Sequence, residues 1–277
     1  MPSERTSMTL LPSPASLRQG VGIARSLLIY WRPGRQRSLR RLYADFLGPG
    51  DLAFDVGAHL GDRTAAFQAL GARVVALEPQ PGLFRCLQRL VGGRSGVILL
   101  PAAAGAEPGE AELAVSEANP TVSTLAREWR DTIGVRNPGF RNVRWESRQP
   151  VTVTTLDALI AEHGTPRFCK IDVEGFEAEV LAGLSQPIEG VSVEFVAGAL
   201  EVAERCVTRL AALGDYRFNA IEGERRQFRW PEWRTADATL GWLAQGADGL
   251  PSGDLYARLD TPNATTPPDT STAETTP

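Results

Sequence analysis

The chain has 277 residues, which is enough for one large α/β domain or two small ones. Hydrophobic residues make up 43% of it, which supports a sizeable core, and a net charge of −4 gives no general sign of nucleic-acid binding. Three cysteines without C-x-x-C spacing and only two histidines argue against a disulfide framework and a zinc site. They predict reduced thiols in a cytoplasmic protein.

The N-terminal part of the chain is expected to precede the main domain. Residues 1–16 are rich in Ser and Pro and are predicted to be flexible, and residues 17–49 form a basic helical lead-in that Pro33-Gly34 splits in two. Residues 1–50 carry eight Arg against two acidic residues. We expect no signal peptide and no transmembrane segment. The basic helices are expected to pack on the domain, and peripheral contact with a membrane is the alternative.

A repeating strand–helix pattern begins at residue 50. Short apolar strands alternate with helices and are separated by Gly or Pro, which is typical of a doubly wound parallel sheet. The predicted strands are Leu52–Val56, Arg73–Glu78 and Gly96–Leu100, and the helices between them cover 62–70 and 81–91.

The middle of the chain departs from this pattern. Turn residues at 106–110 predict a hairpin, and the polar stretch 116–149 predicts a lid or binding loop. An edge strand is expected at 151–155. Trp129 and Trp145 of the lid either stack on a sugar or pack against the domain, and the sequence leaves both open.

The alternating pattern then resumes and ends near residue 259. Together the elements predict an α/β fold with a mostly parallel seven-stranded sheet, helices on both faces and an inserted hairpin and lid. The domain is expected to cover 50–259, and the Thr/Pro-rich tail 260–277 is predicted to be disordered. The remaining strands are expected at 168–172, 191–196, 216–221 and 254–259, and the remaining helices at 156–163, 176–184, 199–213 and 236–245.

The most informative motif is Asp55-Val-Gly57-Ala-His-Leu-Gly61, where the first strand enters a glycine turn. Glycines let the backbone approach a ligand closely, and the following helix offers free N–H groups. An acid at the first position would repel the pyrophosphate that a dinucleotide fold binds there. Asp55 suits the positive end of S-adenosylmethionine instead. Its alternative role is to cap the next helix.

Two further positions fit an adenosine-containing cofactor. Glu78 ends the second strand beside the glycine turn, where an acid can accept hydrogen bonds from both ribose hydroxyls. NAD enzymes use the same device, so Glu78 does not choose between the two cofactors. Small residues after the third strand, such as Ala102, would admit the flat adenine.

A second cluster surrounds the predicted strand 168–172. Alternation places Lys170, Asp172 and Glu174 on one side, at the carboxyl end of a buried strand. Lys170 can neutralise one carboxylate, and Glu194 ends the next strand at matching depth, which predicts an acidic rim for an acceptor. The alternative is a structural Lys–Asp pair with Glu174 capping a helix.

These motifs, in this order and spacing, resemble the FkbM family of S-adenosylmethionine-dependent methyltransferases. The resemblance rests on D-V-G-A-H-L-G-D, V-A-L-E-P, K-I-D-V-E-G-F-E and S-V-E-F, supported by V-T-V-T-T-L-D-A-L and G-D-L-Y-A. It implies a class I methyltransferase fold and O-methylation of sugars, polyketides or other secondary metabolites. It also implies that Lys170, Asp172 and Glu174 are the family signature. The resemblance implies that Asp55, Gly57, Gly61 and Glu78 contact the cofactor. We also expect Ala58, His59, Pro79 and Ala102 to belong to the cofactor site.

The acidic rim leads to two hypotheses for the chemistry. In the first, Asp172 or Glu174 deprotonates an acceptor hydroxyl, while Lys170 sets the local charge and Glu194 assists. In the second, Asp172 and Glu194 hold Mg²⁺, which lowers the pKa of the hydroxyl. The expected acceptor is a small molecule or carbohydrate, not a nucleic acid. A dinucleotide-dependent oxidoreductase and a non-catalytic cofactor-binding module remain the alternatives.

Overall fold

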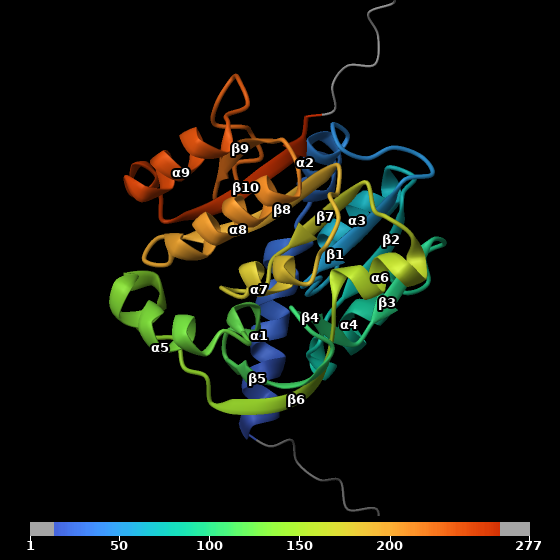
Figure 1. Ribbon diagram of the computed structural model, residues 1–277. Helices are drawn as coiled ribbons and strands as arrows, with labels where there is room; N and C mark the ends of the chain where they lie inside the picture. The colour runs from blue at the N-terminus through green and yellow to red at the C-terminus, as the bar shows by residue number, and fades with distance from the viewer. Residues whose placement is uncertain (1–13, 261–277) are drawn as a thin grey trace, which may run out of the picture.

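The computed structural model describes residues 14–260, which form a doubly wound α/β fold (Figure 1). Its main sheet has seven strands in the order β3-β2-β1-β7-β8-β10-β9, in which only β10 runs antiparallel to its neighbours. This confirms the predicted seven-stranded, mostly parallel sheet. The strands are β1 (Leu52–Val56), β2 (Arg73–Leu77), β3 (Val97–Leu100), β7 (Phe168–Ile171), β8 (Gly190–Val196), β9 (Tyr216–Glu222) and β10 (Ser252–Leu259).

Helices cover both faces of this sheet, as the sequence predicts. One group comprises α2 (Arg35–Tyr43), α3 (Asp62–Ala69) and α4 (Pro81–Val91). The other group comprises α6 (Leu156–His163), α7 (Glu177–Ala182), α8 (Leu200–Leu213) and α9 (Ala236–Ala244). A short 3₁₀ turn at Ala247–Gly249 leads into β10.

The strands divide their apolar side chains between the two layers. In β1, Phe54 and Val56 belong to the core beneath α6–α8, whereas Ala53 belongs to the core beneath α2–α4. In β2, Val75 and Val74 alternate in the same way. Successive side chains of a strand point to opposite faces, so a strand covered on both sides must be apolar almost throughout. Burial on both faces leaves the carboxyl ends of the strands as the place for polar side chains.

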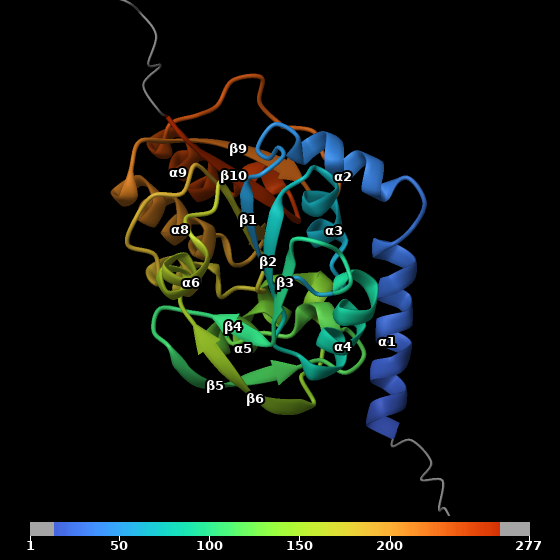
Figure 2. The same cartoon turned by 90° about the vertical axis from the view of Figure 1, so that its right-hand side faces the viewer.

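The inserted segment forms a second, three-stranded sheet at the end of the molecule opposite α2 (Figures 1 and 2). Its strands are β4 (Ala102–Ala104), β5 (Gly109–Val115) and β6 (Ser147–Thr154), in the order β4-β6-β5. The predicted hairpin is therefore wrong: the turn at 106–110 joins two strands that flank β6 and do not pair with each other. The predicted edge strand 151–155 is also wrong, because β6 is the central strand of this small sheet.

The lid consists of η1 (Pro120–Val122), α5 (Arg127–Arg136) and η2 (Pro138–Phe140). Trp129 is buried, and its indole packs against the backbone of Gly175, where a Cβ would lie 2.4 Å from the ring. Trp145 packs edge-on against Trp129 and donates a hydrogen bond to the Val122 carbonyl oxygen at 2.8 Å. Both tryptophans therefore pack within the protein: Trp129 ties the lid to the loop after β7, and Trp145 holds two parts of the lid together.

The N-terminal helix α1 (Pro14–Tyr30) lies along the outer edge of the molecule (Figure 2). It begins earlier than the expected residue 17, and the rest of the predicted flexible segment lies outside the described residues. So does the predicted tail beyond Asp260. Within residues 14–260, no helix has the length and apolar character needed to cross a bilayer. The three cysteines are unpaired, as predicted, and Cys169 and Cys206 are buried.

Candidate active site

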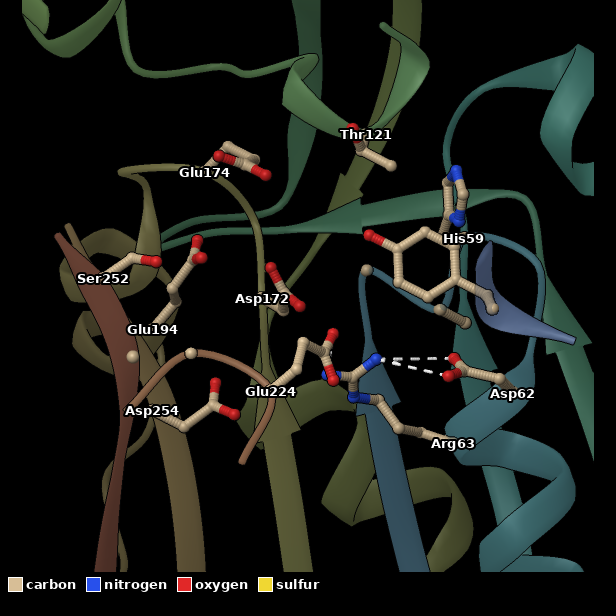
Figure 3. A pocket seen from close by; sticks show the side chains of 15 residues that line it. His59, Asp62, Arg63, Thr121, Asp172, Glu174, Glu194, Glu224, Ser252 and Asp254 are labelled. Atoms are coloured by element: carbon tan, nitrogen blue, oxygen red, sulfur yellow. Dashed lines mark hydrogen bonds and ion pairs between the residues drawn. The ribbon is translucent and has the colours of Figure 1, made fainter. Parts of the chain in front are cut away.

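Two neighbouring cavities open at the carboxyl ends of the central strands. The first, the apolar cavity, is lined by Glu78, Pro79, the β4 alanines and side chains such as Leu113 and Phe176. The second, the acidic cavity, is lined by Tyr30, Ala58, His59, Arg63, Thr121, Ser252 and six carboxylates (Figure 3). Gly57 and Asp172 line both cavities, so the two spaces meet at the ends of β1 and β7.

The glycine turn has the geometry that its sequence predicts. Gly57 has φ +82°, and a Cβ there would lie 1.9 Å from the Asp172 carbonyl oxygen, so no other residue fits. Gly61 has φ +76° and precedes α3, where a Cβ would meet Leu87 of α4 at 2.5 Å. Gly61 lines neither cavity and serves helix packing. His59 adopts the left-handed conformation without being glycine, with φ +52°.

Glu78 lies at the meeting point of the turn and the apolar cavity. Its carboxylate accepts hydrogen bonds from the backbone N–H groups of His59 at 3.0 Å and Gln80 at 2.8 Å. The side chain is 3% exposed, and burial raises the pKa of Glu78 to about 8 despite these two donors. Each oxygen keeps a further acceptor site for a ligand hydroxyl. Pro79 and Ala102 line the same cavity.

Asp55 lies deeper than the sequence suggests. It occupies the same face of β1 as Ala53, so α3 covers it, and its Oδ2 accepts a hydrogen bond from the Thr64 hydroxyl at 2.5 Å. It lines neither cavity, and its Oδ1 is buried without a hydrogen-bond partner among the described residues. The N-cap position of α3 is Gly61, so Asp55 does not cap this helix.

Lys170 and Asp172 form an ion pair beneath the acidic cavity. The Lys170 Nζ and Asp172 Oδ2 atoms lie 2.6 Å apart, and Lys170 is almost fully buried. Burial alone would raise the pKa of Asp172, but Lys170 and the nearby Arg63 hold it below the ordinary value. Asp172 is therefore ionised at neutral pH and faces both cavities.

The remaining signature carboxylates gather above this pair. Strand β7 ends at Ile171, so strand alternation does not extend to Glu174, whose φ of +56° turns it toward the acidic cavity. Oxygens of Asp172, Glu174 and Glu194 lie within 4.8 Å of one another, and these residues could hold a divalent cation. Burial and the neighbouring carboxylates raise the pKa values of Glu174 and Glu194. Glu174 does not cap α7, because the N-cap position of this helix is Phe176 and no side chain accepts a hydrogen bond there. Glu177 accepts hydrogen bonds from the backbone N–H groups of Val173 and Gly175.

The sequence does not predict several residues of the acidic cavity. Asp254 lies directly opposite Glu194 in the β8–β10 pair, and the late G-D-L-Y-A motif contains it. Arg63 follows the glycine turn and pairs with Asp62 at 3.4 Å (Figure 3). No local signal marks Tyr30, which reaches the cavity from α1 by a long-range contact.

The methyltransferase FkbM domain matches this chain over residues 55–245. The chain belongs to the FkbM methyltransferase family. This membership and the strand order of the main sheet confirm the predicted class I methyltransferase fold. A search of the curated proteins gave no match for this chain.

Solved structures of low sequence identity also resemble this chain in fold. A TehB-like SAM-dependent methyltransferase of Corynebacterium glutamicum is 11% identical, with 89% of this chain and 100% of that chain covered and a TM-score of 0.46. Precorrin-6y C5,15-methyltransferase of Geobacter metallireducens is 12% identical, with 81% and 86% covered and a TM-score of 0.43. Aeropyrum pernix fibrillarin, solved with S-adenosyl-L-methionine, is 12% identical, with 76% and 67% covered and a TM-score of 0.39.

The two cavities fit the parts of S-adenosylmethionine. The apolar cavity, with small alanines and the buried Glu78, suits adenine and the ribose hydroxyls. The space continues past Gly57 into the acidic cavity, where the carboxylate of Asp172 suits a positively charged centre. The residues present therefore agree with the cofactor that the family uses.

Proposed function

We propose that the protein transfers a methyl group from S-adenosylmethionine to a hydroxyl of a sugar or other small metabolite. One observation carries the proposal: the apolar cavity at Glu78 and the acidic cavity meet at Gly57 and Asp172. This arrangement supports adenosine on one side of the junction and the acceptor on the other. Bound S-adenosylmethionine supplies an electrophilic methyl group on a sulfonium.

The chain's own residues then position the acceptor and remove its proton. Asp172, held ionised by Lys170, accepts a hydrogen bond from the acceptor hydroxyl and orients it. Glu194 or Glu174 takes the proton in its ionised form, and the raised pKa of each group makes that carboxylate a stronger base than an exposed one. Glu194 is the better candidate, since its Oε2 is buried without a hydrogen-bond partner among the described residues.

The charge of the acidic cavity bears on the acceptor class. The six acidic side chains that line this cavity outnumber its one lining guanidinium, that of Arg63, which supports a small neutral or cationic acceptor over a nucleic acid. The carboxylates are Asp62, Asp172, Glu174, Glu194, Glu224 and Asp254. A screen of neutral and amino sugars with radiolabelled cofactor tests this. Transfer only to RNA or DNA would contradict it.

A metal-dependent variant of the same reaction rests on the grouping of Asp172, Glu174 and Glu194 oxygens within 4.8 Å. In that variant these carboxylates would hold Mg²⁺, which would supply a Lewis acid for activating a hydroxyl. Full activity after EDTA treatment excludes the variant, and loss that Mg²⁺ restores supports it.

Calorimetric titration tests the proposed cofactor first. We expect binding of S-adenosylhomocysteine and none of NAD, and we expect Glu78→Ala to abolish it while the exposed Glu110→Ala control does not. Binding of NAD alone would favour the oxidoreductase. S-adenosylhomocysteine binding without transfer to any acceptor would favour the non-catalytic module.

A further inference from the structure

Helices α1 and α2 and the segment between them precede residue 55, where the family match begins, yet they contact the glycine turn and the start of α3. The Trp31 indole donates a hydrogen bond to the Leu60 carbonyl oxygen at 3.1 Å. The Gln36 amide donates to the Asp62 carbonyl oxygen at 2.8 Å. The turn that the family match contains is thus held in place by residues outside the match.

Helix α1 also packs on the lid. Gly22 approaches η1 so closely that a Cβ there would lie 2.8 Å from the Pro120 Cδ atom. The next residue of η1, Thr121, lines the acidic cavity (Figure 3). Helix α1 therefore spans the distance from the lid to the glycine turn, along one wall of the cavity.

Tyr30, the last residue of α1, forms part of that wall. Its ring packs edge-on against the His59 imidazole, with 5.3 Å between the ring centroids. Burial and then the charge of Asp172 raise the pKa of Tyr30, so its phenol stays protonated and can donate a hydrogen bond. Tyr30 lies beside the turn, whereas Glu194 and Asp254 belong to strands β8 and β10. This places Tyr30 on the cofactor side of the acidic cavity.

Arg35 holds this arrangement together. Its Nε lies 2.6 Å from the Asp62 Oδ2, and its two terminal nitrogens bind the two Glu224 oxygens at 3.0 and 3.1 Å. The guanidinium carbon lies 4.8 Å from the centroid of the Tyr30 ring. Arg35 is 2% exposed, so one buried guanidinium joins α3, the segment after β9 and the tyrosine.

We propose that Tyr30 is a cofactor-binding residue that closes over the amino-acid end of S-adenosylmethionine, and that Arg35 is its positioning residue. The proposal rests on the proposed function, because it assumes that the cofactor extends from Glu78 past Gly57 into the acidic cavity. The N-terminal helices then complete the cofactor site and are not a passive lead-in.

Two probes separate this contact from a general effect on the fold. S-adenosylhomocysteine carries the amino-acid end, and adenosine lacks it. In calorimetric titrations of the full chain, we expect Tyr30→Ala to lower the ratio of S-adenosylhomocysteine to adenosine affinity roughly tenfold. Tyr30→Phe keeps the ring and is expected to lower the ratio roughly threefold. An unchanged ratio in Tyr30→Phe and Tyr30→Ala overturns the proposal, and if Tyr30→Ala does not fold, Tyr30→Phe decides.

A double-variant cycle tests the role of Arg35. Arg35→Met is expected to lower the ratio of S-adenosylhomocysteine to adenosine affinity. The double variant Arg35→Met/Tyr30→Phe is expected to have the same ratio as Arg35→Met alone, because Arg35 acts through Tyr30. If Arg35→Met lowers the affinities for S-adenosylhomocysteine and for adenosine by the same factor, the role of Arg35 is merely structural. Leu28→Ala is the matched control on α1, because Leu28 is 79% exposed. If the unaltered protein binds no S-adenosylhomocysteine, the proposed function fails first. Binding with unaffected variants overturns only the role of Tyr30 and Arg35.

Discussion

The Glu78→Gln variant is expected to be less stable than the unaltered protein at pH 5 and more stable than it at pH 9. Burial raises the pKa of Glu78 from 4.5 to about 8, so between these values the folded protein holds a proton that the unfolded chain has released. The stability that the neutral carboxyl contributes is complete below pH 4.5 and is lost as pH rises through 8. At about 1.36 kcal/mol per pKa unit, the loss reaches about 5 kcal/mol.

Gln keeps one acceptor oxygen, so it loses one of the two backbone hydrogen bonds that Glu78 accepts, at a cost of about 1–3 kcal/mol at every pH. At pH 5 the unaltered protein is therefore the more stable, and at pH 9 the variant is. Urea unfolding at both pH values measures the difference, with the exposed Glu110→Gln as the control. A difference that is the same at pH 5 and pH 9 would refute the reasoning.

Three further substitutions test the turn and the ion pair. Burial lowers the pKa of His59 to about 4, so stability is lost as pH falls from 6.5 towards 4, by up to about 3 kcal/mol. Asn tolerates the left-handed backbone, so His59→Asn should reduce the loss of unfolding free energy between pH 6.5 and pH 4, as measured by urea unfolding. An unchanged loss in this variant contradicts the role of His59. Gly57→Ala should abolish S-adenosylhomocysteine binding in calorimetry, because its Cβ would meet the Asp172 carbonyl oxygen at 1.9 Å; normal binding contradicts the turn geometry. Lys170→Met should cost about 3–5 kcal/mol in urea unfolding by leaving Asp172 without its partner, whereas a loss below about 1 kcal/mol would make the pair unimportant.

The sequence predicts those parts of the site that lie within short segments. Strands β1 and β7 are recognisable because burial on both faces requires mostly apolar residues, and the one charged residue in each, Asp55 or Lys170, lies next to its carboxyl end. Lys170 and Asp172 are two positions apart at such an end, so their pairing could be predicted from spacing alone. Glu78 could be predicted in the same way, from its place after β2.

The sequence does not predict what depends on distant pairing. The turn at 106–110 has the residues of a hairpin, but local chemistry does not say that β6 would insert between the two strands. The sequence predicts correctly that Asp55 lies near the end of β1. It does not predict that the side chain of Asp55 lies under α3 and contacts Thr64. The contact between Arg35 and Glu224 joins residues far apart in the chain, and no short motif encodes it.

A structure of the protein bound to S-adenosylhomocysteine would show directly whether the two cavities form one cofactor site. We expect adenine beside Ala102, ribose hydroxyls on the Glu78 carboxylate, and the amino-acid end beyond Gly57 in the acidic cavity, next to Tyr30. Adenosine density in the acidic cavity, or a ligand that leaves Glu78 without contact, would contradict the account.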